Sequence, residues 1–368
     1  MGRVEEYIKV LAREKFVRTS DVKGGNVLMP NCIKSWEKMK ALLQEKLSEE
    51  GFENWYFPMF IRVDKFKKQE EHFKGFFEEL VIAKHVGDKD LEHELAIRPT
   101  SEIVMYDSLR EILNEEELPL KLNQFCSVVR WEFKRANVPL LRDNEFLWQE
   151  SHSMHATEEE ALAMTAKMLA NYKEIIEEKL CLPCVVGEKP NRRKFAGAKK
   201  TFAIEALMPD GKSIQLATSH YLGQNFSEVF DLKKNGGAVY QCCHGITTRA
   251  LGSAIFYYFN EDGINLPPAI SPKEIENAEE IQKEFAENAK AYLKEHFFQT
   301  ENKEEFNKLL NAQSGFVETN WCGNDDCSYE VKKWNGSSLR ITKDAFSEKK
   351  CLVCGKDAVS SAVFAPSY

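Results

Sequence analysis

The chain has 368 residues, of which 43% are hydrophobic and 29% are charged, a composition typical of a soluble globular protein with two or three domains. No stretch approaches the roughly 20 consecutive apolar residues that cross a bilayer, and no apolar run resembles a signal peptide, so we expect a cytoplasmic protein that does not enter the membrane. The net charge of -8 argues against a general nucleic-acid coat protein, although it leaves room for a local basic patch.

The first part of the chain predicts a helix followed by a strand. Apolar residues recur at helical spacing over residues 33–50, and Gly51 follows as a C-terminal stop. Residues 54–61 are aromatic and β-prone, so we expect a strand there. Because Pro58 lies inside it, this strand belongs at a sheet edge or a bulge.

The middle of the chain predicts further strands. We expect two of them at residues 127–133 and 145–154, joined by a loop rich in Arg, Asn and Pro. The sequence Pro-Asp-Gly at 209–211 predicts a hairpin between strands at 201–207 and 213–218.

Helices alternate with these strands without a βαβ repeat. Thr157 and Glu160 form a capping box that begins a helix running to about Leu180, and an apolar helix covers residues 249–259. We therefore predict an α+β fold with an antiparallel sheet flanked by helices rather than a doubly wound fold. Prolines 267 and 268 end this part of the chain. A charged helix over 272–298 and a small cysteine-bearing unit follow, so the predicted domains are 1–270, 271–310 and 311–368.

Four of the ten cysteines are paired at short spacings in the C-terminal unit. Cys322 and Cys327 are separated by four residues, and Cys351 and Cys354 by two. This pattern indicates a zinc site, and four thiolates would make it closed and structural. The remaining six cysteines occur singly, so we expect free thiols.

Polar residues alternate along the two predicted central strands. Arg130 and Glu132 would share one face of the first strand, and Trp148, Glu150 and His152 one face of the second. A solvated sheet face would also explain these charges. It does not explain the apolar residues that crowd both sides of them, which favour a lined pocket: Val129, Trp131, Phe133, Phe146 and Leu147.

These segments carry a family resemblance. "VVRWEF" with "LRDNEFLWQE" resembles motif 2 of the class II aminoacyl-tRNA synthetases in its prolyl form. "NWYFPMF" resembles motif 1, and "GITTRALG" resembles motif 3. "RPTSE" and "TSHYLGQNF" are similar to further prolyl-enzyme signatures, and the five segments occur in the family's order over residues 8–270. The resemblance implies a class II catalytic domain at 1–270, a helical connector at 271–310 and a zinc-binding α+β domain of the archaeal and eukaryotic type at 311–368.

The resemblance assigns roles to individual residues. Arg130 would bind the α-phosphate and the substrate carboxylate, and Arg249 would hold the γ-phosphate; these two are the expected catalytic residues. The remaining ATP contacts would come from Glu132, Arg142, Gln215 and Thr218. Besides Arg130, the resemblance implies proline contacts from Thr100, Glu102, Trp148, Glu150, His152, Phe195 and His220. Phe195 and Trp148 are also compatible with plain core aromatics, and His220 with a satisfied internal histidine.

The implied reaction is formation of an aminoacyl-adenylate from ATP, with Mg²⁺ bridging the phosphates and Zn²⁺ in the cysteine site. Motif 1 implies a homodimer through the helix 33–50 and the strand that bears Pro58.

The chain departs from the family in having no room for the anticodon-binding domain between Pro268 and the zinc unit. It also carries Ser151, Leu216-Ala217 and Asn31-Cys32 where the family has smaller or different residues. These side chains leave open whether proline or a close analogue is the substrate.

Three functions remain open at this point. The activated residue could pass to tRNA(Pro) without anticodon reading, or to a carrier protein or small molecule. The chain could also be a non-catalytic regulatory homologue. The joint presence of Arg130, Glu132, Arg142 and Arg249 favours catalysis, because ATP ligands have no structural reason to occur together.

Overall fold

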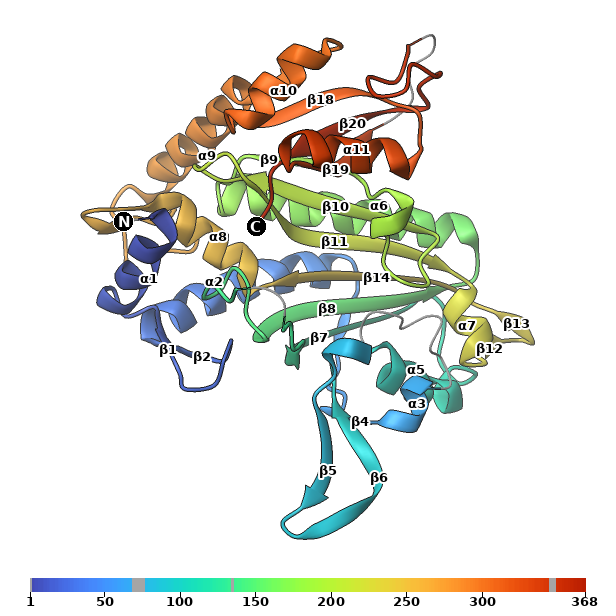
Figure 1. The fold of residues 1–368 in the computed structure, drawn as a ribbon. Helices are drawn as coiled ribbons and strands as arrows, with labels where there is room; N and C mark the ends of the chain where they lie inside the picture. The colour runs from blue at the N-terminus through green and yellow to red at the C-terminus, as the bar shows by residue number, and fades with distance from the viewer. Residues whose placement is uncertain (1, 68–76, 134–135, 344–348) are drawn as a thin grey trace. The chain divides into compact units, whose positions relative to one another are not determined.

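The computed structural model describes residues 2–67, 77–133, 136–343 and 349–368 (Figure 1). The chain forms two compact units with interleaved segments. Unit 1 contains residues 1–168, 195–199 and 219–252, and unit 2 contains residues 169–194, 200–218 and 253–368. Within the described ranges, no helix is both long and apolar enough to cross a membrane. The limits predicted above for three domains remain a prediction.

Unit 1 holds the first half of the chain. Its helices are α1 (Arg3–Arg13), α2 (Pro30–Glu49), α3 (Val63–Lys67), α5 (Glu102–Ile112) and α7 (Asn225–Val229). Its longer strands are β5 (Ile82–Val86), β6 (Lys89–Ile97), β7 (Leu120–Val129), β8 (Glu145–His155) and β14 (Tyr240–Thr247). Its short strands are β1 (Val17–Thr19), β2 (Asn26–Leu28), β3 (Glu53–Asn54), β4 (Phe60–Arg62), β12 (Lys233–Lys234) and β13 (Gly237–Ala238).

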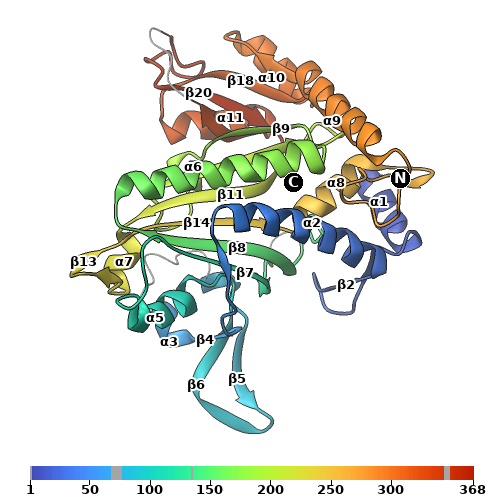
Figure 2. The ribbon, with the colours of Figure 1, turned by 180° about the vertical axis from the view of Figure 1, so that it is seen from behind.

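Helix α2 confirms the helix predicted over 33–50 and begins three residues earlier. Pro30 occupies the first turn, where its missing N–H costs nothing. Its buried stripe is Cys32, Ser35, Trp36, Met39, Leu43 and Leu47. Gly51 follows with a φ of +76°, a conformation that a Cβ disfavours. The helix lies across one face of the unit 1 sheet (Figure 2), where Lys40 sits over the Phe125 ring of β7.

The strand predicted at 54–61 is wrong as a single element. The chain forms β3, leaves the ladder, and returns as β4, which pairs with β6 in a separate three-stranded sheet. Between them the Phe57 N–H donates to the side-chain Oε1 of Gln124 at 3.1 Å rather than to a strand partner. Pro58 has no N–H to offer a ladder.

The unit 1 sheet has the order β3-β7-β8-β14, and β7, β8 and β14 are antiparallel neighbours. The strand predicted at 145–154 is confirmed by β8. The strand predicted at 127–133 is wrong beyond Val129, so Arg130 and Glu132 are not strand neighbours on one face. Arg130 N still donates to Asn144 O at 2.7 Å, in register with the β7–β8 pairing. Glu132 N, in contrast, donates to Arg130 O at 3.1 Å and to the Asn144 side-chain Oδ1 at 3.3 Å, which turns the chain out of the ladder.

The long helix α6 (Glu158–Glu174) is followed by a π-helical turn over Ile175–Lys179. Together they end next to Leu180, where the sequence predicted the end of the helix. Its capping box is formed. Glu160 N donates to Thr157 Oγ1 at 3.3 Å, and Thr157 N donates to Glu160 Oε2 at 3.4 Å. The chain passes between the units within α6 and again within β11 (Ser213–Gly223).

Unit 2 contains the C-terminal part of the chain. Its strands are β9 (Cys184–Glu188), β10 (Lys200–Leu207), β15 (Phe259–Asn260), β16 (Gly263–Ile264), β17 (Phe297–Gln299), β18 (Phe316–Trp321), β19 (Ser338–Lys343) and β20 (Ser360–Ala365). Its helices are α8 (Thr248–Tyr258, which begins in unit 1), α9 (Ala278–Glu295), α10 (Lys303–Asn311) and α11 (Asp325–Asn335). Its sheet has the order β17-β18-β20-β19-β9-β10.

Strands β10 and β11 confirm the hairpin predicted from residues 201–218, and α8 confirms the apolar helix predicted over 249–259. The charged helix predicted over 272–298 is shorter, because α9 ends at Glu295 and the chain continues as β17, parallel to β18.

Candidate active site

The register of three strands assembles a buried polar cluster in unit 1. Glu150 of β8 lies opposite Gln124 of β7 and Gly245 of β14. Two residues on, His152 lies opposite Leu122 and Cys243. Because side chains two apart on a strand point to the same face, Glu150 and His152 share the face that α5 supplies with Glu102 and Tyr106.

Glu150 is buried and fully engaged. Its Oε1 accepts hydrogen bonds from Ser101 Oγ and Gln124 Nε2, and its Oε2 lies 3.5 Å from His152 Nε2. Burial opposes ionisation, but the hydrogen bonds and the charge of His152 outweigh it and lower the pKa of Glu150. A carboxylate that stays ionised in a closed pocket can hold an ammonium group.

The pKa of Glu102 is shifted in the opposite direction, upward. This residue stands in the first turn of α5, is buried, and accepts a hydrogen bond from Thr100 Oγ1. Burial raises its pKa, an effect that His152 reduces and that the nearby charge of Glu150 increases. The buried cluster thus contains two carboxyl groups of different acidity, and the ionisation of both would respond to a nearby cation.

An aromatic wall adjoins these acids. The Phe195 ring lies 4.9 Å from the His220 ring and 6.4 Å from the Phe226 ring, centre to centre. Burial, and then the charges of His152 and Arg130, lower the pKa of His220 to about 3, so this ring is neutral near pH 7. A neutral wall of this kind suits a small apolar ring.

Arg130 interacts both with the buried carboxyl groups and with a cluster of arginines. Its Nε donates to Pro99 O at 2.9 Å, and its guanidinium lies 5.3 Å from the Trp148 ring centre. Arg249 is buried and donates from Nε to Leu141 O at 2.9 Å. Burial, followed by the charges of Arg142 and Arg130, lowers the pKa of Arg249 to about 10. Guanidinium groups that lie close enough to repel one another are chemically suited to bind an anion between them.

The loop between β7 and β8 is fixed against the start of α8. Tyr7 donates from its hydroxyl to Pro139 O at 3.1 Å and to Gly252 O at 3.3 Å. A Cβ on Gly252 would lie 2.4 Å from the Leu140 Cβ. The absence of a side chain at Gly252 therefore lets the helix that carries Arg249 approach the loop that carries Arg142.

The structure brings most of the predicted residues into unit 1. These are Thr100, Glu102, Arg130, Glu132, Arg142, Trp148, Glu150, His152, Phe195, His220 and Arg249. Arg142 Nε and Glu132 Oε2 are 3.9 Å apart. Gln215 and Thr218 lie on the part of β11 that belongs to unit 2. The ligand-binding roles of all these residues stay predictions. Arg135, in the predicted motif 2 loop, lies outside the described residues.

Sequence reasoning missed several residues that hold the site. Ser101 and Gln124 hold Glu150, and Tyr106 contacts His152 Nδ1 through its hydroxyl at 2.9 Å. Ser101 lies inside the quoted "RPTSE" segment, so its position was a usable signal. Gln124 had no such signal, because only the pairing of β7 with β8 places it opposite Glu150.

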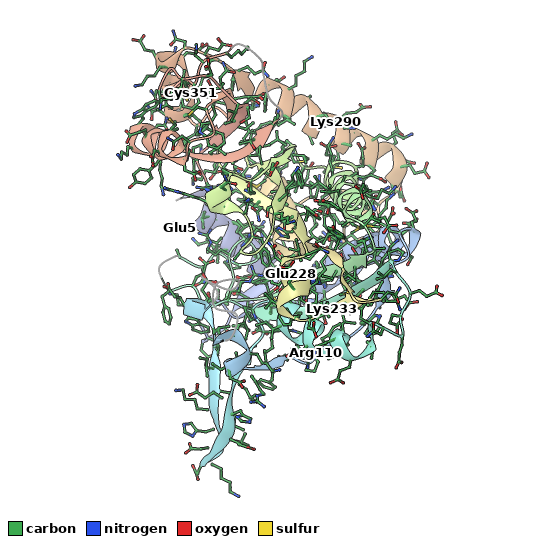
Figure 3. The ribbon with its side chains drawn as sticks, turned by 90° about the vertical axis from the view of Figure 1, so that its right-hand side faces the viewer. Glu5, Arg110, Glu228, Lys233, Lys290 and Cys351 are labelled. Atoms are coloured by element: carbon green, nitrogen blue, oxygen red, sulfur yellow. The ribbon has the colours of Figure 1, made fainter. Side chains whose placement is uncertain are left out.

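A second cluster lies in the C-terminal part of unit 2, where Figure 3 labels Cys351. The sulfurs of Cys322, Cys327, Cys351 and Cys354 all lie within 4.8 Å of one another. The Cys322 sulfur is 3.6 Å from those of Cys327 and Cys354. Four sulfurs placed tetrahedrally about 2.3 Å from a zinc ion would be about 3.8 Å apart, so the cluster has the dimensions of a zinc site.

Two family models match the chain. The tRNA synthetase class II core domain (G, H, P, S and T) matches residues 82–256, and the prolyl-tRNA synthetase C-terminal domain matches residues 303–368. The chain is 31% identical to proline–tRNA ligase 2 of Clostridioides difficile over 98% of this chain and 95% of that protein. It is 44% identical to proline–tRNA ligase of Borreliella burgdorferi (strain ZS7), over 73% of this chain and 56% of that protein.

A solved structure has the same fold. Prolyl-tRNA synthetase from Cryptosporidium parvum, in complex with halofuginone and AMPPNP, matches with a TM-score of 0.90 and 27% identity, over 98% of this chain and 94% of that one. The alignment with the Clostridioides difficile enzyme spans 463 positions, whereas this chain has 368 residues, so at least 95 positions of the alignment have no residue here. Between the two family-model matches lie only residues 257–302.

Proposed function

Because the chain belongs to the prolyl-tRNA synthetase family, we propose that it activates proline with ATP to prolyl-adenylate and transfers the prolyl group to tRNA(Pro). The observation that carries this proposal is the position of Arg130 in unit 1. It lies between a pocket of two carboxyl groups with an aromatic wall and a cluster of anion-binding arginines. An amino acid and a nucleoside triphosphate need these two environments side by side.

In this proposal each part of the substrate meets a complementary group. Glu150, which stays ionised, and Glu102 hold the secondary ammonium, while Phe195 and the neutral His220 enclose the ring. Arg130 orients the proline carboxylate and the α-phosphate. A carboxylate oxygen attacks the α-phosphorus, and the bond to the bridging oxygen breaks to release pyrophosphate. Arg142 and Arg249 stabilise the charge on the phosphates, and Glu132 completes the part of the nucleotide site that unit 1 supplies. Mg²⁺ supplies further charge neutralisation when bound.

We also propose that the four-cysteine cluster of unit 2 binds one structural zinc ion. Four thiolates at tetrahedral spacing leave no open position for substrate. The hydrophobic cluster around it, which includes Trp321, Val331 and Leu352, would lose its organisation without the metal.

We further propose a homodimer formed through α2 and the segment around Pro58. Several large apolar side chains there are exposed, including Tyr56 at 71% and Phe60 at 51%. Exposed apolar patches of this kind are typical of interaction surfaces. Light scattering at micromolar concentration should give twice the mass of the chain, and Tyr56→Asp should lower it. A wild-type monomer would contradict the proposal.

The alignment positions that have no residue in this chain bear on which molecule finally accepts the prolyl group. If the residues that read the anticodon are absent, tRNA must be recognised through its acceptor stem, or the prolyl group passes to a carrier protein or small molecule instead. The at least 95 unmatched alignment positions favour keeping this second candidate. Charging assays on a tRNA(Pro) transcript decide between them. Prolyl-tRNA formed at a rate comparable to proline activation supports tRNA, and activation without charging supports another acceptor.

A further inference from the structure

A second group of potential metal ligands lies in unit 1. Glu102, His152 and Cys243 each offer one ligand atom, and these atoms all lie within 4.8 Å of one another. They come from three elements, since α5 carries Glu102, β8 carries His152 and β14 carries Cys243 opposite His152. All three are nearly inaccessible, with exposed fractions of 2%, 1% and 4%. His152 and Cys243 are paired across β8 and β14, so the sheet itself holds these two ligands next to each other.

We propose that Glu102, His152 and Cys243 form a site for a zinc-class divalent cation, separate from the four-cysteine cluster. One thiolate, one imidazole and one carboxylate are the ligand types that zinc accepts. Three protein ligands leave a fourth position for water, unlike the closed cysteine cluster. On binding, the Cys243 thiol releases its proton to solvent and its sulfur bonds to the metal.

The surroundings of His152 suit this role. Its Nδ1 is 2.9 Å from the Tyr106 hydroxyl, and its Nε2 is 3.5 Å from Glu150 Oε2. In the metal-bound form, His152 Nδ1 carries the ring proton and donates a hydrogen bond to the Tyr106 oxygen. The lone pair of Nε2 is then available to the ion. A hydrogen bond of this kind to the non-ligating nitrogen orients metal-binding histidines.

The site overlaps the pocket proposed for the ammonium group of proline, and this part of the inference rests on the proposed function. Glu102 and His152 would contact either the ion or the substrate. Two cations cannot occupy one buried position a few ångströms across, because their repulsion is strong where water is excluded. The ion therefore excludes proline, and zinc should inhibit proline activation competitively with proline.

The chain contains a matched control in the neighbouring cysteine. Cys242 is also buried, but adjacent residues of a strand point to opposite faces, and its sulfur contacts Ser153 Oγ at 2.9 Å and His155 Nε2 at 3.7 Å. Cys242→Ser and Cys243→Ser therefore each replace one sulfur with oxygen, but on opposite faces of β14, and only Cys243→Ser changes the proposed site.

The test is a cobalt(II) titration of the full chain whose four-cysteine cluster has been filled with zinc. We expect one further equivalent of cobalt, with a thiolate-to-cobalt absorption band for a single sulfur. Cys243→Ser should abolish this band, Cys242→Ser should keep it, and Tyr106→Phe should weaken binding about tenfold or more while keeping the band. Absence of a further equivalent, or a band that survives in Cys243→Ser, would overturn the proposal. Cys243→Ala replaces Cys243→Ser if the serine variant does not fold.

Exchange of pyrophosphate into ATP then tests the overlap with proline. Added zinc should raise the KM for proline without changing the maximal rate, and Cys243→Ser should lose this effect. Inhibition that proline does not relieve would overturn the overlap. If no amino acid supports exchange, the proposed function fails, whereas the cobalt titration still decides whether the metal site exists.

Discussion

Arg340→Met should strongly destabilise unit 2, because Arg340 belongs to a buried ionic network. Glu205 on β10 is inaccessible to solvent, and its Oε2 accepts hydrogen bonds from Arg340 Nη2 at 2.7 Å and from Ser213 Oγ at 2.7 Å. Lys189 donates from Nζ to the other carboxylate oxygen. The network joins β10 to β19, which lies in the part of the chain matched by the C-terminal family model.

The magnitude follows from the acidity of Glu205. Burial alone would raise its pKa, but Arg340 and Lys189 together hold it at about 2, below the ordinary value of 4.5. A shift of that size corresponds to roughly 3 kcal/mol. It agrees with the about 3–5 kcal/mol lost when one partner of a buried ion pair is removed. Because Lys189 remains beside Glu205 as a second cationic partner in Arg340→Met, we expect a loss at the lower end of that range, about 3 kcal/mol.

Urea unfolding followed by tryptophan fluorescence measures this loss. Arg192→Met is the control, because Arg192 is 66% exposed and its pair with Asp325 at 3.3 Å should contribute less than about 1 kcal/mol. The depressed pKa of Glu205 also fixes a pH dependence. Its stabilisation is present above about pH 4.5 and is lost as the pH falls toward 2, so the difference between wild type and Arg340→Met should shrink over that range. A loss no larger than that of Arg192→Met would mean that the buried network does not stabilise unit 2.

Three further predictions concern packing, the metal and RNA. Gly252→Ala should cost about 1–3 kcal/mol and reduce ATP binding, because the new Cβ would meet Leu140 at 2.4 Å; unchanged melting and an unchanged KM for ATP would count against this. Elemental analysis should find one zinc per chain more in the wild type than in Cys322→Ser with Cys354→Ser, and this double variant should have a lower melting temperature. A tRNA(Pro) transcript with a changed anticodon should be charged about as well as the natural one, and a tenfold loss, about 1.4 kcal/mol, would reveal an anticodon reader.

The sequence predicted the elements that are set by local patterns. Apolar spacing located α2, the capping box located α6, and Pro-Asp-Gly located the hairpin between β10 and β11. These signals depend on residues a few positions apart, so one chain segment carries them completely.

The errors occurred where distant residues decide the local structure. The β-prone segment around Pro58 is not a strand, because the Gln124 side chain takes the place of a ladder partner. Strand β7 ends at Val129 because the Glu132 N–H bonds to Arg130 O and to the Asn144 side chain rather than to a ladder partner. Arg130 and Glu132 therefore do not share a strand face, whereas Glu150 and His152 share one on β8 as predicted.

In the candidate site, too, local sequence signals were predictive and contacts between distant residues were not. Its chemistry-bearing side chains could be predicted, because they lie in segments that resemble a known family. The residues that hold them, such as Gln124 and Tyr106, could not, because they become neighbours only through the pairing of β7 with β8 and the packing of α5.

Pyrophosphate exchange into ATP, measured with each amino acid in turn, shows directly whether the chain activates proline. The two carboxyl groups, the aromatic wall and Arg130 predict exchange that depends on proline and exceeds that with any other amino acid. Arg130→Ala should reduce it at least about 10²-fold, since the guanidinium stabilises charge at the reacting phosphate. Wild-type protein that supports no exchange with any amino acid, or equal exchange by Arg130→Ala, would contradict the account.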